Sequence, residues 1–277
     1  MFLVTGATGN VGGELVRLLA RTHQGVRALT RDPASAELPA TIEAVPGDLN
    51  VARTLRPALA GARGVFLLPG YPDMPAILTE IRAAGVEHVV LLSGSSAASG
   101  DMSNAISAYM IRSEEAAKYS GVPWTILRPS GFMSNALRWI PQLRAGDVVR
   151  EPFADASVAV IDPADIAAVA AAVFRSPRPH KGQTYELSGP DALLPGDRLR
   201  LLGAVLRRNL RLEALPHDEA REQMSREMPA AYVDAFFDFY VHGTLDESRV
   251  HPTAAQILGR PPRTFLQWAH EHKEAFR

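Results

Sequence analysis

Short apolar runs recur along the first half of the chain, separated by polar or glycine-containing stretches. Runs such as VFLL and HVVLL are apolar at every position, which is typical of parallel strands that are buried on both faces of a sheet. Their enrichment in β-branched and aromatic residues also favours strands. The pattern predicts strands over residues 2–5, 26–30, 42–46, 64–68, 89–93 and 124–128.

Longer segments with helical periodicity separate these strands. They predict helices over residues 11–22, 55–60, 75–84 and 104–121. Strands that alternate with helices at this spacing form successive βαβ units. The expected fold class is therefore α/β, with a doubly wound parallel sheet.

The pattern changes after residue 130. A variable segment to about residue 152 precedes SVAVIDPADIAAVAAAVF, which predicts a strand and then an alanine-rich helix that packs closely on the sheet. Further strands are expected in TYELSGP and RLEALP, with a helix in LPGDRLRLLGAVLRRNL between them. The remaining C-terminal part is mostly helical in pattern.

Composition narrows the class of protein. The chain has 277 residues, 47% hydrophobic and 21% charged, as expected for one large α/β domain or a domain with a lobe. A net charge of −1 gives no basis for binding nucleic acid or an anionic membrane. The absence of cysteine excludes disulfides, thiolate metal sites and thiol catalysis. No apolar run approaches the roughly 20 residues of a membrane span. The opening MFLVTGATGN lacks the features of a signal peptide, so a cytoplasmic protein is expected.

A glycine-rich segment, TGATGNVGGEL, follows the first strand and opens the first helix. Its G-x-x-G-x-x-G spacing permits a tight turn, close approach of a pyrophosphate to the backbone, and close packing of helix on strand. The helix N-terminus adds unpaired N–H groups and the positive end of the helix dipole. The segment therefore predicts a dinucleotide site with contacts from Gly6, Thr8, Gly9, Asn10, Val11 and Gly12.

The end of the second strand, VRALTRDP, indicates which dinucleotide binds. An acidic residue there would bind the ribose 2′-hydroxyl of NAD(H), but Thr30 and Arg31 occupy the place. Arg31 is a planar donor that can bracket a 2′-phosphate, so NADP(H) is the expected cofactor. The alternative is an ordinary surface arginine that Asp32 partly neutralises. Further cofactor contacts are expected at the ends of the third, fourth and fifth strands, from Asp48, Leu49, Leu68, Pro69, Gly70 and Ser93.

The segments TGATGNVG, GDL and GVPWTILRPSGFMSN together resemble the NmrA-like, atypical branch of the short-chain dehydrogenase/reductase superfamily. Residues 161–171 and 258–276 are similar to that branch as well. The resemblance implies a Rossmann-type, NADP(H)-binding domain of residues 1–130 plus 153–175. Residues 131–152 plus 176–277 would form a smaller, mainly C-terminal α+β substrate lobe with a helical lid. The branch contains reductases and also nucleotide-sensing regulators without turnover, so the resemblance leaves the activity open.

Active members of the wider superfamily place a serine after the fifth strand and a Tyr-x-x-x-Lys pair on the next helix. Ser95, in LLSGSSA, stands where that serine is found. Its hydroxyl would hydrogen-bond a substrate carbonyl, which makes it the candidate catalytic residue. The alternative is that the serines of this segment only complete a loop turn.

The tyrosine–lysine pair is absent from the sequence. Tyr109 is followed four residues later by Ser113, and no lysine of the chain has a tyrosine four residues before it. When the helix is aligned on Glu114, Ile106 and Met110 fall at the family's tyrosine and lysine positions. Tyr109 is rotated by about 60° from that face. We therefore expect it in the wall of the substrate pocket or in packing, rather than in direct proton transfer.

Reduction does not require that pair, because the cofactor supplies the hydride and the protein mainly positions the carbonyl and excludes water. A hydroxyaryl ketone or peri-hydroxy quinone could take its proton from its own phenol or from water. A bulky aromatic, polyketide-type substrate is therefore expected, as in antibiotic-tailoring reductases. Sulfur and aromatic side chains would give the pocket an adaptable wall, although they serve equally well as core. The pocket residues expected are Ser96, Tyr109, Met110, Phe132 and Met133.

Residues 221–243 form an amphipathic, aromatic-rich stretch that suits a lid over the substrate or a dimer face, and we favour the lid. The histidines lack metal-ligand spacing, so no metal is expected. The sequence thus predicts an NADPH-dependent ketoreductase of a small molecule, monomeric or homodimeric, with no nucleic-acid or membrane partner. A non-catalytic NADP(H)-sensing regulator and an NADPH:quinone reductase are the alternatives.

Overall fold

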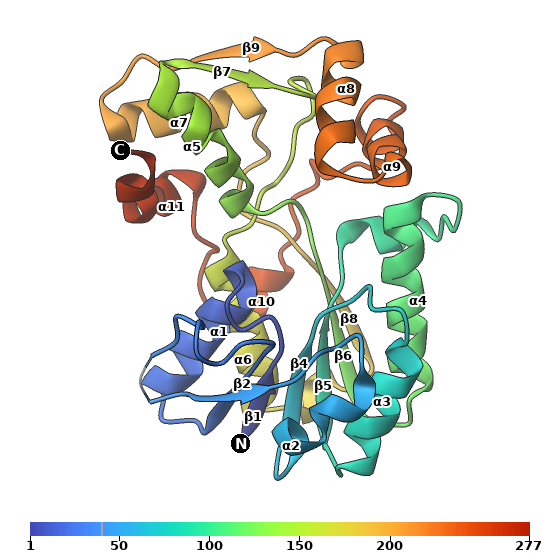
Figure 1. Ribbon diagram of the computed structural model, residues 1–277. Helices are drawn as coiled ribbons and strands as arrows, with labels where there is room; N and C mark the ends of the chain where they lie inside the picture. Colours follow the sequence, from blue (N-terminus) through green and yellow to red (C-terminus); the bar gives the residue numbers. More distant parts are fainter. Residues whose placement is uncertain (40) are drawn as a thin grey trace.

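A parallel β-sheet forms the lower half of the molecule in the computed structural model, which describes residues 1–39 and 41–277 (Figure 1). Its seven strands in these residues lie in the order β3-β2-β1-β4-β5-β6-β8, and neighbouring strands are parallel. The order reverses between β1 and β4, and ligands of such sheets bind at the carboxyl ends of the strands around this switch point. The predicted α/β, doubly wound Rossmann-type fold is confirmed. The strands are β1 (Phe2–Val4), β2 (Val26–Thr30), β3 (Glu43–Pro46), β4 (Gly64–Leu67), β5 (His88–Leu92), β6 (Trp124–Pro129) and β8 (Gln183–Leu187).

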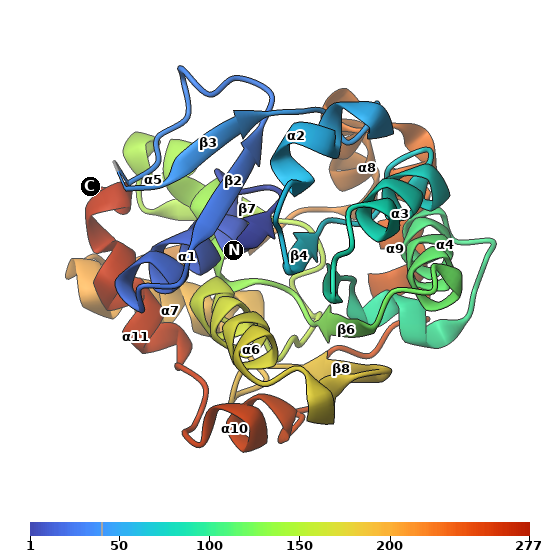
Figure 2. The ribbon, with the colours of Figure 1, turned by 90° about the horizontal axis from the view of Figure 1, so that it is seen from below.

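Helices cover both faces of this sheet (Figure 2). On one face lie α1 (Asn10–Arg21), α6 (Pro163–Arg175) and α10 (Thr253–Leu258). On the other lie α2 (Arg56–Leu59), α3 (Met74–Ala83) and α4 (Ala105–Tyr119), preceded by the short 3₁₀ turn η1 (Ala52–Leu55). The helix predicted over residues 104–121 is therefore present as α4, and Asn104 caps it by accepting hydrogen bonds from two backbone N–H groups of the first turn.

Alternate residues of each strand enter the two hydrophobic cores. Val4 and Phe66 pack under α1 and α6, whereas Leu3 and Val65 pack under the helices of the opposite face. Each of these four side chains is fully buried. The two-sided burial is the physical reason that the strands read as continuous apolar runs.

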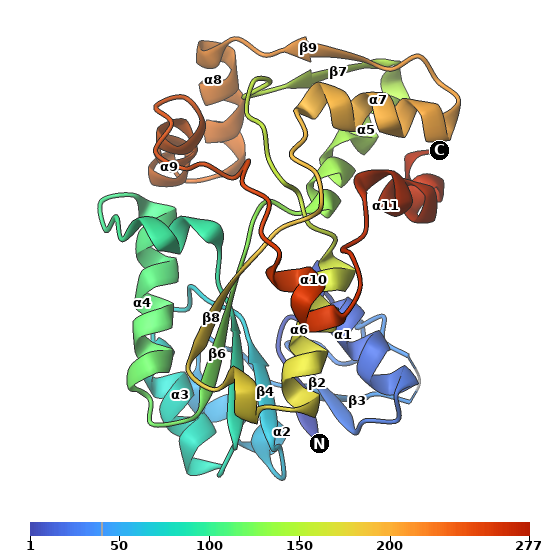
Figure 3. The same ribbon diagram turned by 180° about the vertical axis from the view of Figure 1, so that it is seen from behind.

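A second body, the lobe, stands above the carboxyl ends of the strands (Figures 1 and 3). Its core contains two buried tryptophans, Trp139 and Trp268, together with Phe265 and Leu199. In the lobe β7 pairs in parallel with β9, and the C-terminus also lies there. Its elements are η3 (Met133–Trp139), α5 (Ile140–Ala145), β7 (Val148–Glu151), α7 (Pro195–Leu206), β9 (Arg211–Ala214), α8 (His217–Glu227), α9 (Ala230–Tyr240), α11 (Phe265–His272) and η5 (Lys273–Phe276).

The structure corrects the sequence interpretation between residues 145 and 190. The strand predicted in SVAVI is wrong, because Val158 and Ile161 form isolated bridges to Leu193 and Phe132 instead of a ladder. This segment passes between the sheet and the lobe and divides its backbone hydrogen bonds among separate partners. β7 lies in the segment read as variable, and the sequence missed it.

The predicted division of the chain also needs two changes. We assigned residues 253–258 to the lobe, but α10 packs on the sheet with α1 and α6. We assigned residues 183–187 to the lobe, but β8 is the edge strand of the main sheet and pairs with β6. The crossover through α6 and the 3₁₀ turn η4 (Arg178–His180) returns the chain to the sheet edge. Across the described part of the chain, no helix combines the length and apolarity needed to cross a membrane.

Candidate functional site

The glycine-rich turn lies at the switch point, between the carboxyl end of β1 and the start of α1. Gly6 has a φ of +60°, and a Cβ on it would lie 2.5 Å from Leu68 Cδ1. A Cβ on Gly12 would lie 2.2 Å from the carbonyl oxygen of Gly6, so only glycine lets the helix begin this close to the turn. Gly9 caps α1 without a side chain, which leaves the N–H groups of the helix N-terminus free for an anion.

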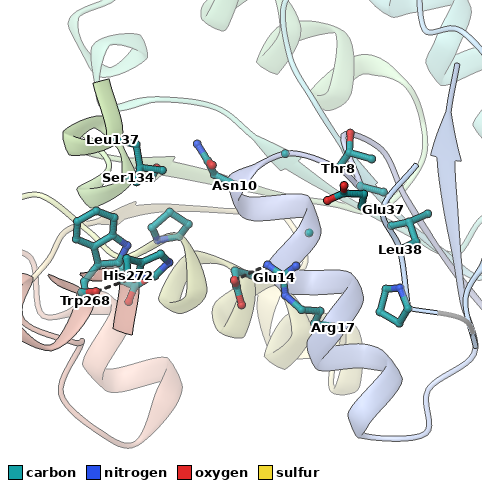
Figure 4. Close-up of a pocket in the computed structure, with 16 residues that line it drawn as sticks. Thr8, Asn10, Glu14, Arg17, Glu37, Leu38, Ser134, Leu137, Trp268 and His272 are labelled. Atoms are coloured by element: carbon teal, nitrogen blue, oxygen red, sulfur yellow. Dashed lines mark hydrogen bonds and ion pairs between the residues drawn. The ribbon is translucent and has the colours of Figure 1, made fainter. Parts of the chain in front are cut away.

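Two cavities extend from this turn. The larger, about 720 Å³, lies over the carboxyl ends of β2 and β3. The smaller, about 220 Å³, lies between the N-terminal part of α1 and the lobe, with Asn10 on the side of Ser134 and Thr8 on the side of Glu37 (Figure 4). Because Thr8, Arg17 and Glu37 line both cavities, the two adjoin along the turn, as an extended dinucleotide requires. Of the predicted cofactor residues, these cavities are lined by Gly6, Thr8, Gly9, Asn10, Arg31, Asp48 and Leu49.

Arg31 lies in the larger cavity with an exposed side chain. Asp32 does not neutralise it: no ion pair joins them in residues 1–39 and 41–277, and the Asp32 carboxylate accepts a hydrogen bond from the N–H of Ala34. Hydrogen bonds from Ser35 and from that N–H hold the pKa of Asp32 below its usual range. Arg31 therefore keeps its donors for a ligand. Burial, then the charge of Asp48, raises the pKa of Tyr71 on the opposite wall.

Several predicted cofactor residues line neither of the two cavities. Val11, in the first turn of α1, is 4% exposed and packs in the core of the sheet. After β4, Gly70 turns with a φ of +85°, and its N–H donates to Ser113 Oγ at 2.9 Å. Pro69, the residue before Gly70, is half-buried. The sequence interpretation missed several residues that line the cavities, because their side chains come from the next turn of α1 or from distant segments. These are Arg17, Glu37, Asn50, Tyr71, Ser134, Trp268 and His272.

Ser93 is committed to a buried ion-pair cluster. Its Oγ donates to Glu114 Oε1 at 2.7 Å, and Arg128 donates to both carboxylate oxygens of Glu114 at 2.7 Å. Lys118 Nζ completes the cluster at 3.1 Å. Burial pushes the pKa of Glu114 up, but the hydrogen bonds from Arg128 and Ser93 outweigh it and hold the pKa below its usual range. The cluster ties α4 to β5 and β6, so a cofactor contact from Ser93 would use its backbone.

Ser95 joins the sheet to the lobe. It opens the 3₁₀ turn η2 (Ser95–Ser99) at the carboxyl end of β5, and its Oγ donates to Glu247 Oε1 at 2.6 Å. Glu247 is 8% exposed, and its backbone oxygen accepts a hydrogen bond from the N–H of Ala159 at 2.7 Å. A Cβ on Gly131 would lie 3.9 Å from Glu247 Oε2. The carboxylate is therefore fixed at the carboxyl ends of β5 and β6.

Tyr240, the last residue of α9, binds the other oxygen of the same carboxylate. Its hydroxyl donates to Glu247 Oε2 at 2.7 Å. Burial, reinforced by the negative charge of Glu247, raises the pKa of Tyr240 well above its usual range. Ser95, Glu247 and Tyr240 thus form one hydrogen-bonded group, which we call the Ser95 network. It combines a carboxylate with two hydroxyl groups at the carboxyl end of β5.

Tyr109 lies apart from this network. It lines a groove of about 740 Å³ between α3 and α4, packs over Gly70, and meets Tyr232 of α9 edge-on at 6.2 Å between ring centroids. Burial raises the pKa of Tyr109, which makes it a weaker source of protons. Met110 packs against Gly94, the residue before Ser95, as expected for the helix face that the family's lysine would occupy.

The other predicted pocket residues are more buried than expected. Met133 is 1% exposed within the lobe core, so it offers no surface to a ligand in this structure. Ser96 is 4% exposed in η2. Phe132 is half-buried and packs against the core of the sheet, so it stays a candidate pocket wall.

The sequence interpretation missed Glu247 and Tyr240, because they are separated from Ser95 by more than half of the chain. Tyr240 lies inside the aromatic stretch 221–243, for which a lid was predicted, and α9 does reach the sheet domain: Asn104 Nδ2 donates to the carbonyl of Ala235 at 3.2 Å. Glu247 follows in LDES, where two adjacent acidic residues carry no spacing signal. Within the described residues, no group of three or more His, Asp or Glu residues is placed to hold a metal ion.

Comparison with known proteins adds a family and several relatives. The NAD(P)H-binding family model matches residues 6–177. A (4-alkanoyl-5-oxo-2,5-dihydrofuran-3-yl)methyl phosphate reductase from Streptomyces griseus is 40% identical over 100% of this chain and 99% of its own length. An NAD(P)H azoreductase from Xenophilus azovorans is 35% identical over the same shares of the two chains.

Solved structures support the fold. An NADPH-dependent quinone oxidoreductase from Escherichia coli superposes with a TM-score of 0.79 at 23% identity, over 98% of this chain and 99% of that one. NmrA, a negative transcriptional regulator, superposes with a TM-score of 0.76 at 16% identity, over 98% and 94% of the two chains. Reductases and a regulator thus share this architecture, so the fold by itself does not decide between them.

Proposed function

The chain belongs to the NAD(P)H-binding family, in the NmrA-like, atypical branch of the short-chain dehydrogenases/reductases, and is an NAD(P)H-dependent oxidoreductase; from this premise we propose that it reduces a carbonyl-bearing small molecule with NADPH. A ketoreductase of a bulky, polyketide-type compound is the finer form of the proposal. The preference for NADPH rests on Arg31. Its guanidinium lines the cavity over β2 and β3 and, in the described residues, makes no ion pair with Asp32.

The observation that carries the proposal is the hydrogen bond from Ser95 to the buried Glu247. Bound NADPH supplies the hydride in this family. When hydride reaches a carbonyl carbon, or the far end of a conjugated double bond, negative charge develops on the oxygen. In this proposal, the hydroxyl of Ser95 at the carboxyl end of β5 donates to that oxygen and stabilises the charge.

Glu247 and Tyr240 give this serine a source of protons. Glu247 is a carboxylate acceptor of Ser95 in this structure. In the proposed relay it takes up a proton from solvent, its O–H then donates to Ser95, and the Ser95 hydroxyl is released to donate to the substrate. As the charge develops, Ser95 passes its proton to the substrate oxygen and takes one from Glu247, which solvent then reprotonates. Tyr240 holds the carboxyl group in position. This network replaces the expectation that the proton comes from the substrate or from water alone.

The relatives' printed names suggest which acceptors to test. They name a phosphorylated alkanoyl-furanone and an azo substrate, and a structural neighbour is a quinone reductase. Each acceptor contains a conjugated heteroatom that gains negative charge on hydride addition. A cytoplasmic location and a monomeric or homodimeric state remain predictions.

The test is NADPH oxidation with a panel of hydroxyaryl ketones, quinones and an alkanoyl-furanone phosphate. We expect turnover of at least one carbonyl compound, and we expect Ser95→Ala to reduce it by about 100-fold or more, as for loss of an oxyanion donor. Absence of turnover across the panel, with clearly different affinities for NADPH and NADP+, would instead favour the non-catalytic sensor.

A further inference from the structure

The lobe contains a buried arginine that the proposed reaction does not use. Arg198, on α7, is 6% exposed, and its guanidinium lies over the ring of Trp139 at 5.9 Å from the centroid. In the part of the chain that the structure describes, its side chain has no ion pair and no hydrogen bond, and its buried Nε has no partner. A buried guanidinium without an acceptor is costly to keep, so its retention calls for an explanation.

Arg198 interacts electrostatically with the Ser95 network. Burial lowers the pKa of Arg198 to about 10, while the nearby Tyr240 and the charge of Glu247 act in the opposite direction. The guanidinium therefore stays charged at neutral pH. Both oxygens of Glu247 are already occupied, one by Ser95 and one by Tyr240.

A second cation, Arg138, lies in the same part of the lobe. Its guanidinium donates to Glu151, whose other oxygen accepts the indole N–H of Trp139 at 2.8 Å. The side chain of Arg138 is 55% exposed, and yet surrounding protein and then the charge of Arg198 lower its pKa. Arg138 is thus reachable from solvent, and the two arginines meet at Trp139: Arg198 lies over its ring, and Arg138 shares its partner Glu151. The local acids are both engaged, which leaves the donors of Arg198 for a ligand.

We propose that Arg198, with Arg138 beside it, binds a phosphate group on the substrate. Two guanidinium groups match the charge and the several acceptor oxygens of a phosphate monoester, and the planar fork of arginine favours such bidentate contacts. The proposal rests on the proposed function for the position of the reacting carbonyl. It adds the substrate class: a carbonyl compound with a phosphate ester, anchored in the lobe while its carbonyl faces Ser95.

The kinetic test compares a phosphorylated carbonyl substrate with its dephosphorylated form. Wild-type protein should prefer the phosphate form in kcat/KM by about 10- to 100-fold, as for hydrogen bonds to a charged group. Arg198→Met should bring this ratio close to one, and Arg198→Lys, which keeps the charge but loses the fork, should give an intermediate ratio. Arg200→Met is the matched control, because Arg200 is on the same helix with a side chain 71% exposed. A wild-type ratio near one overturns the proposal.

A binding test is independent of turnover. Phenyl phosphate is titrated calorimetrically into protein saturated with NADP+, so that the cofactor's phosphate site is already filled. We expect binding to wild type and to Arg200→Met, and affinity at least about 10-fold weaker in Arg198→Met. Binding without turnover of any carbonyl compound would leave this subsite standing and refute the proposed function. Turnover without phosphate binding would refute the subsite alone. If Arg198→Met does not fold, the wild-type and Arg198→Lys titrations decide.

Discussion

Replacement of Glu247 by glutamine probes the Ser95 network with the smallest change in shape. The amide oxygen of glutamine can still accept from Ser95, whose Oγ lies 2.6 Å from Glu247 Oε1 in the native protein. The amide cannot carry the exchangeable proton that the proposed relay requires. The substitution therefore keeps the position of Ser95 and removes its proton source.

The expected loss follows from this geometry. A general acid contributes about 10²- to 10⁴-fold in rate, so kcat/KM should fall by that factor, or about 3–5 kcal/mol in the barrier. In the folded state, the substitution replaces a charged acceptor of two hydroxyl groups by a neutral one. Each charge-assisted hydrogen bond contributes about 1.5–3 kcal/mol, so the protein should lose some stability but stay folded. NADPH affinity should not change, because the cofactor cavities do not include Glu247.

The assay is the pH dependence of kcat/KM for the best substrate of the panel, in wild type and Glu247→Gln, alongside NADPH titration by fluorescence. The variant should be slower than wild type across the pH range, because its amide cannot pass a proton to Ser95. A variant with wild-type kcat/KM and an unchanged pH profile would refute the proton relay. Loss of NADPH binding in the variant would instead show that Glu247 acts on the structure.

Further predictions concern other parts of the molecule. Tyr240→Phe should lower kcat/KM by roughly 10-fold through loss of one hydrogen bond to a carboxylate. Tyr109→Phe should change kcat/KM by no more than about 2-fold. Steady-state kinetics that gave the reverse order for the two variants would contradict this assignment. Arg31→Ala should weaken NADPH binding by about 10- to 100-fold and leave NADH binding unchanged, and equal losses for both cofactors in fluorescence titrations would show that Arg31 does not contact a 2′-phosphate. Burial, then nearby positive charge, lowers the pKa of His88 from 6.5 to about 4. The folded protein thus takes up this proton later than the unfolded chain, and about 3 kcal/mol of stability present above pH 6.5 should be lost as pH falls through 4. Denaturant unfolding between pH 7 and 4 should show a shallower decline for His88→Gln than for the exposed-site control His270→Gln, and equal declines would contradict this.

The sheet and the glycine-rich turn could be predicted because their signals are local. A strand buried on both faces must be apolar at each position, and Gly6 and Gly12 stand where a Cβ would collide with neighbouring atoms. The place of β8 could not be predicted, because a half-exposed edge strand has no continuous apolar run and its pairing depends on the path of the chain after α6.

Only the part of the candidate site that belongs to the sheet domain could be predicted from the sequence. Ser95 could be predicted from its position just after the fifth strand. The absence of the family's lysine could be predicted from the helical register, which puts Met110 in its place. Glu247 and Tyr240 reach Ser95 through the packing of α9 on α4 and the path of residues 241–252, which no periodicity encodes. No sequence pattern singled out Arg198, because its burial over Trp139 depends on the same tertiary packing.

A crystal structure with NADP+ and an unreactive carbonyl analogue tests the central claim most directly. We expect the analogue's carbonyl oxygen to lie within about 2.6–3.2 Å of Ser95 Oγ. Glu247 should lie behind the serine, and the carbonyl carbon should face the nicotinamide. A carbonyl bound by Tyr109, or a nicotinamide remote from Ser95, would contradict it.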